Sequence, residues 1–522
     1  MQPLKDLVTI LNRYAVRDID VITNPERKRS KEDSRYWEMY AGLQKGRWKD
    51  EDEVAQHFNY ASRTDKGYRR LKEGLKERLH NSVLFIDLGS QGISRYHQKG
   101  QELYRLWAVS ECLSRRGSFE AYYEVASKAL DIALDIENVS AIVEITCRLR
   151  TYLAVRPNFA KEYLRLKDIH NKYWRAMQLE MEAQNDLLFI ISSLVNKKGY
   201  KKEHAPVADA FYQRYQKDLA EIDTVMFQVC VRLLQVYSHI LVHDWSGGLA
   251  AADEALTFLL NKGEKSADHV VTFGTQKASC LLMLKKYDEA RSTLDSLLIH
   301  APEGKPTWFK NREVAAVNAL YSENYREAWF LVNEIITHER FNVVSEVDQE
   351  TWRLYYGYLQ WLVKSGIATE ASDIPVNDTF KLTRWLNDMP LYGLDKRGGN
   401  IPLLILQIHF LITAYRSDPN NYDAICNRIE ALRKYSSRNL DRESEHFRTD
   451  CFLSLLQLLP KYIHDVQKLS VAAAPVLQRM NTVHVDLLDS SFETEVVPYE
   501  RQWEWICLQL QPGKYSHREV VL

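Results

Sequence analysis

The chain has 522 residues, too many for one ordinary compact core, so the sequence requires several domains or an extended repeat array. Lys and Arg total 69 and Asp and Glu total 70, which gives a formal net charge of −1. This balance excludes a global attraction to nucleic acid or anionic membranes and leaves only local patches for such contacts.

Few residues in the chain break helices. Glycine numbers 20 and proline 14, both low against average usage, and alternating strand patterns are almost absent. The sequence therefore predicts an all-α fold. The seven cysteines are scattered with no C-x-x-C pair, which is typical of free, mostly buried thiols in a reducing compartment. No secretory signal and no run of 18 apolar residues is found, so we expect a cytoplasmic protein without a membrane partner.

Residues 1–92 predict an N-terminal helical region. A polar stretch at 24–33 precedes an amphipathic helix, and that helix has an apolar stripe formed by Tyr68, Leu71, Leu75, Leu79, Val83 and Ile86. Between Arg63 and Arg78, seven basic residues stand against three acidic ones. The candidates for nucleic-acid contact are Arg63, Lys66, Arg69 and Arg70. A solvated helix face is the favoured interpretation, because the like charges also follow the polar side of the helix.

Residues 100–370 predict an array of helical hairpins. Tyr287-Asp288-Glu289-Ala290 is echoed 38 residues later by Tyr325-Arg326-Glu327-Ala328. The shared register includes Ala278 with Ala316, Leu294 with Val332, and Leu297 with Ile335. An aromatic residue also opens the expected second helix at Phe119 and at Trp245. Repeats of this period are typical of stacked helical hairpins, in which small residues let two helices approach closely.

This pattern resembles the tetratricopeptide repeat. The family's small residue, aromatic, alanine and proline match Ala278, Tyr287, Ala290 and Pro302, whereas the second copy lacks the proline and both copies lack the Trp-x-x-Leu-Gly opening. The resemblance implies a right-handed superhelical stack, an α-solenoid, with helical N- and C-terminal regions. The whole chain also resembles uncharacterised bacterial proteins that end in an acidic-aromatic segment, here Glu495-Val496-Val497-Pro498-Tyr499-Glu500.

Two further regions follow the array. Residues 371–402 hold three prolines and three glycines and predict a connection rich in breakers. Residues 403–522 predict a C-terminal helical region, whose aromatic segment 499–505 is a candidate cap for the exposed end of a repeat stack.

Motifs for chemistry are weak. His239 and His243 lie four residues apart, a metal-ligand spacing on a helix, but no third ligand follows and interhelical packing is favoured. Phosphate-cradling loops, nucleophile elbows and kinase signatures are missing from the sequence. We therefore expect no catalytic residues, no cofactor and no metal, although an enzyme without a sequence signature is a rival hypothesis.

The array suggests a scaffold, adaptor or sensor subunit that binds a peptide or protein on its concave face. The candidate binding residues on the first helices are Lys277, Arg312 and Asn318, together with the pair Trp308 and Phe309, for which core packing is the favoured alternative. A regulatory protein with a nucleic-acid-contacting N-terminal region is the other function considered. The sequence leaves the oligomeric state open.

Overall fold

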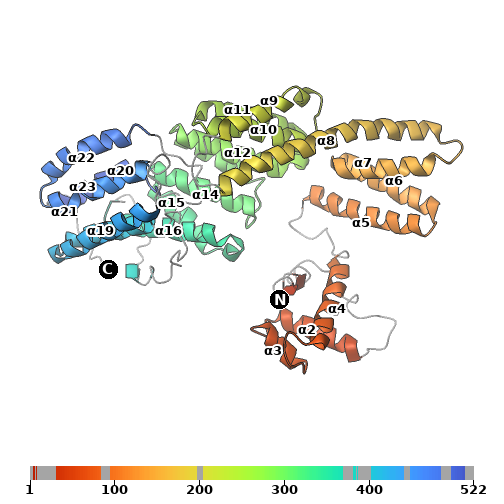
Figure 1. Ribbon diagram of the computed structural model, residues 1–522, viewed down its shortest axis with the longest axis horizontal. Helices are drawn as coiled ribbons and strands as arrows, with labels where there is room; N and C mark the ends of the chain where they lie inside the picture. The colour runs from red at the N-terminus through yellow and green to blue at the C-terminus, as the bar shows by residue number, and fades with distance from the viewer. Residues whose placement is uncertain are drawn as a thin grey trace. The chain divides into compact units, whose positions relative to one another are not determined.

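The computed structural model describes most of the chain, and these residues are helical with no strand among them (Figure 1). The described residues are 4–5, 7–8, 31–83, 94–196, 204–367, 380–383, 385, 401–439, 447–483 and 495–511. The predicted all-α class is confirmed for this part of the chain. No helix within it is long and apolar enough to cross a membrane. Most of the predicted connection 371–402 lies outside the described residues.

The chain divides into two compact units, residues 1–174 and 175–522. The division falls inside helix α8, which runs from Ala160 to Asn196, and thus inside the range 100–370 expected to form one array. The helices of the first unit are α2 (Lys31–Gln44), α3 (Glu51–His57), α4 (Lys66–Val83), α5 (Arg95–Arg115), α6 (Phe119–Asp135), α7 (Val139–Leu153) and the first part of α8.

Helix α4 confirms the predicted amphipathic stripe. Tyr68, Leu71, Leu75 and Leu79 are all buried, and they pack in one cluster with residues of α2, α3 and the segment before α2. The side chain of Asp65 accepts hydrogen bonds from the first backbone amides of α4, which accounts for where the helix begins. Ile86 lies outside the described residues.

In the second unit, helices that follow one another along the chain also pack against one another, as α10, α11 and α12 do in Figure 1. Its helices are α9 (Ala205–Tyr215), α10 (Val225–Ile240), α11 (Trp245–Lys262), α12 (Ala267–Met283), α13 (Tyr287–Leu297), α14 (Pro306–Tyr321), α15 (Tyr325–Ile336), α16 (Glu346–Lys364), α18 (Ile401–Tyr415), α19 (Tyr422–Asn439), α20 (Phe447–Leu456), α21 (Leu459–Tyr462), α22 (Val466–Met480) and α23 (Tyr499–Leu510), together with the second part of α8.

One turn recurs wherever two helices form a tight hairpin. Its first residue has a positive φ, its second precedes the next helix, and its third is the first residue of that helix. At Glu323-Asn324-Tyr325, for example, φ of Glu323 is +61°, and the amide of Asn324 donates to the carbonyl of Ala319, 2.9 Å away. This is a Schellman helix end followed at once by a new N-cap. The same turn occurs at Gly117-Ser118-Phe119, Glu137-Asn138-Val139, His243-Asp244-Trp245 and Lys285-Lys286-Tyr287.

The turn fixes which residues of the second helix face the first. Positions three, seven and ten after the residue that opens the helix are buried in α13 and in α15. Ala290 and Ala328 occupy the first of these positions and are fully buried, as are Ala278 and Ala316 on the preceding helices. The register read from the sequence is therefore confirmed at both hairpins.

The seven cysteines are all unpaired in the structure. Cys230, Cys280 and Cys451 are buried, and burial raises the pKa of the Cys230 and Cys280 thiols to about 12. Cys112 and Cys147 are exposed, so the expectation that most thiols would be buried holds for only part of the set.

Replacing Ala290 or Ala328 with leucine should overpack the contact between the helices and lower the free energy of unfolding by about 1–3 kcal/mol. Urea unfolding followed by circular dichroism measures this change. The matched control is Glu289→Leu, at an exposed position beside Ala290, which should change stability by less than about 0.5 kcal/mol. Equal effects at positions 289 and 290 would show that Ala290 does not lie at a close helix contact.

Candidate functional site

The predicted partner-binding residues fall into two groups. Trp308 and Phe309 are buried, and their rings pack together and against His338. Asn318 is also buried and donates from Nδ2 to the carbonyl of Tyr287, 3.1 Å away. These three side chains stabilise the hairpins, and a partner does not reach them in this structure. For the aromatic pair, the core-packing alternative is the one observed.

Lys277 and Arg312 are the two basic residues that were predicted to bind a partner on the concave face. Both form ion pairs with carboxylates on second helices of the hairpins. Lys277 lies 2.7 Å from a carboxylate oxygen of Asp253 on α11. Arg312 lies 3.1 Å from Glu334 on α15 and stacks over the ring of Trp308. Both side chains therefore point toward second helices. The predicted binding surface would lie on the other side of α12 and α14, and these two residues do not line it.

A different row of residues marks that side. Among the pairs of α12 and α14 at the 38-residue offset whose side chains are partly or fully exposed, four follow one another along a single helix face. They are Thr272 and Lys310, Gln276 and Val314, Ser279 and Val317, and Met283 and Tyr321, which we call the α12–α14 row. Successive members are three or four residues apart, so they share one helix face. The row is mostly small or apolar, and Lys310 is its one charged member.

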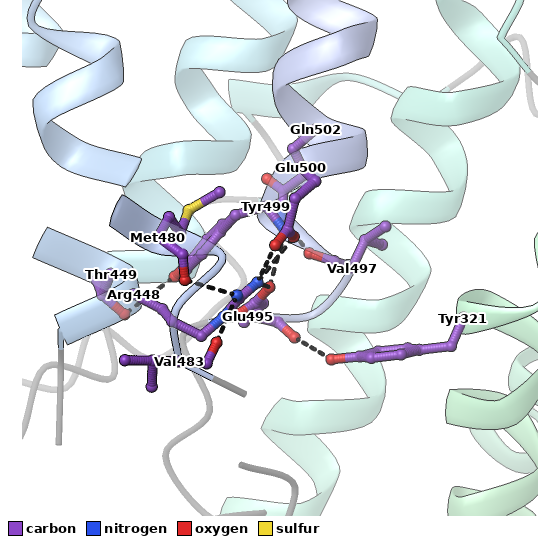
Figure 2. A network of polar contacts seen from close by, with 10 residues as sticks. All are labelled: Tyr321, Arg448, Thr449, Met480, Val483, Glu495, Val497, Tyr499, Glu500 and Gln502. Carbon is purple, nitrogen blue, oxygen red and sulfur yellow. Dashed lines mark hydrogen bonds and ion pairs between the residues drawn. The ribbon is translucent and has the colours of Figure 1, made fainter. Parts of the chain in front are cut away.

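The row ends at a buried polar network formed by the C-terminal segment (Figure 2). The hydroxyl of Tyr321 donates to the backbone carbonyl of Glu495, 3.1 Å away. Arg448 on α20 donates to both carboxylate oxygens of Glu495, at 2.9 and 2.7 Å, and to both of Glu500, at 2.9 and 2.7 Å. It also donates to the backbone carbonyl of Val483, just after α22. The segment is thus tied to α14, to α20 and to the end of α22.

Burial and charge oppose each other in this network. Burial disfavours the charged guanidinium of Arg448, but its hydrogen bonds to Glu495 and Glu500 outweigh burial and raise its pKa above the ordinary value. Burial raises the pKa of Glu495, and the hydrogen bonds from Arg448 offset this only in part. This arrangement was not predicted from the sequence, because Arg448 and Glu495 lie 47 residues apart and belong to no motif.

Helix α23 buries both of its faces. Tyr499, Trp503 and Ile506 belong to a cluster with α18, α19, α20 and α22, whereas Trp505 belongs to a cluster with α14, α15 and α16. The sequence predicted a cap over an exposed end, and the structure instead places this helix between two apolar clusters. Trp505 packs against both Tyr325 and Trp361.

His409 on α18 lies in the same region and is fully buried. Its Nε2 is 2.7 Å from Oε1 of Gln502 on α23, the geometry of a ring N–H donating to an amide oxygen. Its ring stacks on Trp361 with centroids 4.1 Å apart. Burial lowers the pKa of His409 to about 4, and the contact with Gln502 acts in the opposite direction. His409 therefore stays neutral near neutral pH and fixes α23 by a neutral hydrogen bond.

The predicted pair His239 and His243 does not share a helix face, and the metal-ligand spacing is therefore wrong as a helical site. Helix α10 ends at Ile240, and His243 has a positive φ in the turn that follows. His239 instead contacts the carboxylate of Asp244 at 2.8 Å, while His243 stacks on Trp245. Among the described residues, no group of three or more His, Cys, Asp or Glu side chains is arranged to hold a metal ion.

The basic residues of the N-terminal region remain accessible. Lys66, Arg69 and Arg70 are exposed on α4, and their side chains make no hydrogen bond or ion pair with another described residue. Arg63, by contrast, lies 3.8 Å from Asp52, and the neighbouring Lys72 lies 2.6 Å from Glu51.

No protein-family model, no curated protein and no solved structure matches this chain.

Replacing Arg448 with methionine should leave the buried carboxylate of Glu495 without its cation and lower the free energy of unfolding by about 3–5 kcal/mol. Chemical denaturation of the full chain measures the loss. The double variant Arg448→Met with Glu495→Gln should recover part of it, because the uncompensated charge is then removed. Additive losses in the two single variants would argue against the buried ion pair.

The free energy of unfolding of the second unit should decrease as the pH falls, because the folded state keeps His409 neutral. Its folded pKa lies below the unfolded value of 6.5, so the unfolded chain binds the extra proton, and stability decreases as pH falls from about 6.5 toward 4, by about 1.4 kcal/mol per pH unit. Urea unfolding at several pH values tests this against the variant His409→Gln, which should lack this component. Identical pH slopes in the two proteins would contradict the assignment.

Proposed function

We propose that this chain is a non-catalytic cytoplasmic scaffold, adaptor or sensor subunit, and that its hairpins form a tetratricopeptide-like superhelical stack. A peptide or a partner domain binds along the first helices of the stack. The α12–α14 row carries the proposal, because the same face of two consecutive first helices is left partly open at the same register. Repeat stacks use this inner face to hold extended partners.

The composition of the row favours a peptide with apolar side chains. Val314, Val317 and Met283 supply apolar contact, and Gln276 supplies an amide for the peptide backbone. Each first helix is fixed by the hairpin turn and by contacts such as Asn318 with Tyr287. A surface held in this way loses little conformational entropy on binding.

The test is selection from a random peptide library displayed on phage, panned against the immobilised full chain. Binding of a selected peptide should weaken at least about tenfold, or 1.4 kcal/mol, in the variants Gln276→Arg and Val314→Glu, because both changes place charge on the contact surface. The melting temperature should change little, since both side chains are partly exposed.

The matched control is Phe330→Glu on α15. Phe330 is exposed, and it lies on a second helix away from the row. The control should bind the selected peptides like the wild type. If no peptide is enriched, or if the control loses binding as much as the row variants do, the α12–α14 row is not the binding surface.

One observation favours a second candidate function, contact with nucleic acid. Lys66, Arg69 and Arg70 are spaced by three and four residues on α4, so they lie on one face and none is neutralised by a described carboxylate. Guanidinium groups arranged in this way suit phosphate oxygens. In this reading the N-terminal helices contact the nucleic acid and the hairpins sense a peptide or protein.

Fluorescence anisotropy with labelled duplex DNA and RNA, measured over a range of salt concentrations, tests this candidate. Replacing all three residues with alanine should weaken binding and reduce the slope of log affinity against log salt by about 3, since each phosphate contact contributes about 0.9. The control replaces Lys434, Lys461 and Lys468, which are surface lysines of the second unit. An equal loss in the control, or no binding at low salt, rules out a specific role for α4.

A further inference from the structure

The second part of α8, from residue 175 onward, packs one of its faces within the second unit. Ala176, Ala183, Leu187 and Ile190 are buried. Three charged side chains lie along the flanks of this face and are engaged with neighbouring elements. Arg175 contacts Asp218 and Glu221, Asp186 contacts Arg214 and Tyr215, and Glu180 accepts from Thr224.

A second face of this part of α8, beside the buried one, is apolar and largely exposed. Met181 is 57% exposed and Leu188 is 52% exposed, while Met177 and Ile191 are half-buried and Gln184 is exposed. These five residues follow one another at spacings of four, three, four and three, which is the a/d pattern of a helix that packs against another helix. We call them the α8 stripe.

None of the five residues of the α8 stripe is charged, and Glu180, which borders Met177 and Gln184, accepts a hydrogen bond from Thr224 of its own unit. The residues on its exposed edge are Gln178, Asn185, Ser192 and Phe189, and Phe189 is 51% exposed. A solvated helix face normally carries the charged residues of the helix, whereas here Arg175, Glu180 and Asp186 contact the unit's own body, and the exposed Glu182 lies beyond the edge residues, away from the stripe. The stripe therefore has the composition of a covered surface and not of a solvated one.

We propose that the α8 stripe pairs with the same stripe of a second copy of this chain, in antiparallel orientation. A two-fold axis passing between residues 182 and 183 would place Met181 against Gln184 of the partner subunit and Met177 against Leu188 of the partner subunit. Such an interface is self-complementary, as two-fold interfaces must be. No like charges meet across it, and the two helix dipoles oppose each other.

The polar residues support pairing of helices over burial in lipid. Gln184 lies in the middle of the stripe, where an amide in an acyl layer would lack hydrogen-bond partners. At a helix–helix contact a single central amide instead fixes the register. Gln178 and Asn185 lie on the same edge of α8. Antiparallel pairing brings Gln178 of one copy near Asn185 of the other copy, and their amide groups form hydrogen bonds with each other.

The stripe covers about two heptads, or about 21 Å of helix, so the contact is small and the association should depend on concentration. Light scattering coupled to gel filtration of the full chain, from about 1 to 100 µM, should show the mass rising toward that of a dimer. The variants Met181→Glu and Leu188→Glu should remain monomeric over this range, because each places two carboxylates, one from each subunit, in the interface.

Two controls replace exposed apolar residues elsewhere in the same unit. Ile299→Glu and Val471→Glu change side chains that are 84% and 76% exposed, and both variants should dimerise like the wild type. A wild type that stays monomeric at the highest concentration overturns the proposal, and so does a dimer unaffected by Met181→Glu. Binding of the monomer to vesicles through these residues also overturns it.

Orientation is tested by disulfide trapping in a Cys112→Ser, Cys147→Ser background, which removes the two exposed native thiols. Met177→Cys protein mixed with Leu188→Cys protein should form mixed disulfide dimers under mild oxidation. Met177→Cys alone should cross-link poorly. Efficient cross-linking of Met177→Cys with itself would indicate parallel helices and overturn the antiparallel arrangement.

Discussion

Each tight hairpin of this protein depends on one residue held in the left-handed region of backbone space. That conformation ends one helix, satisfies its last carbonyls and begins the next helix two residues later. An L-residue in this conformation costs about 1–2 kcal/mol, and four of the five turns use Glu, His or Lys instead of glycine. The packing of two apolar helix faces offsets this cost. The turn fixes the register, and the register determines which side chains of α12 and α14 remain open.

The open row and the buried network are parts of one arrangement. Tyr321 ends both α14 and the row, and it bonds to Glu495, whose carboxylate is held by Arg448. A ligand on the row would thus contact a helix that is anchored directly to the C-terminal segment. His409 and Gln502 hold the same segment from α18. Because these bonds are buried and mutually dependent, they hold the C-terminal segment against α14, α18 and α20 together.

The sequence predicted the features that are local. An aromatic at the first position of a second helix and an alanine three residues later have a fixed spacing, so Tyr287, Ala290, Tyr325 and Ala328 were assigned correctly. The turn at Glu137 was missed because it lacks both glycine and the aromatic, which Val139 replaces. Arg448 and the buried position of Asn318 were missed for another reason. Whether a polar or aromatic residue is buried depends on partners far away in the chain, and a periodic pattern does not contain them.

The position of α23 has a consequence for synthesis on the ribosome. Hairpins such as α12–α13 close over short stretches of chain and can form as they emerge. The clusters around α14–α16 and α18–α22 are different, because both lack Trp503, Trp505 and their neighbours until residue 511 has left the exit tunnel. About two hundred residues are therefore synthesised before these two clusters can be completed, and their apolar surfaces stay exposed for about 10–40 s at ordinary rates of elongation. This part of the protein is where nascent chains would most need a chaperone.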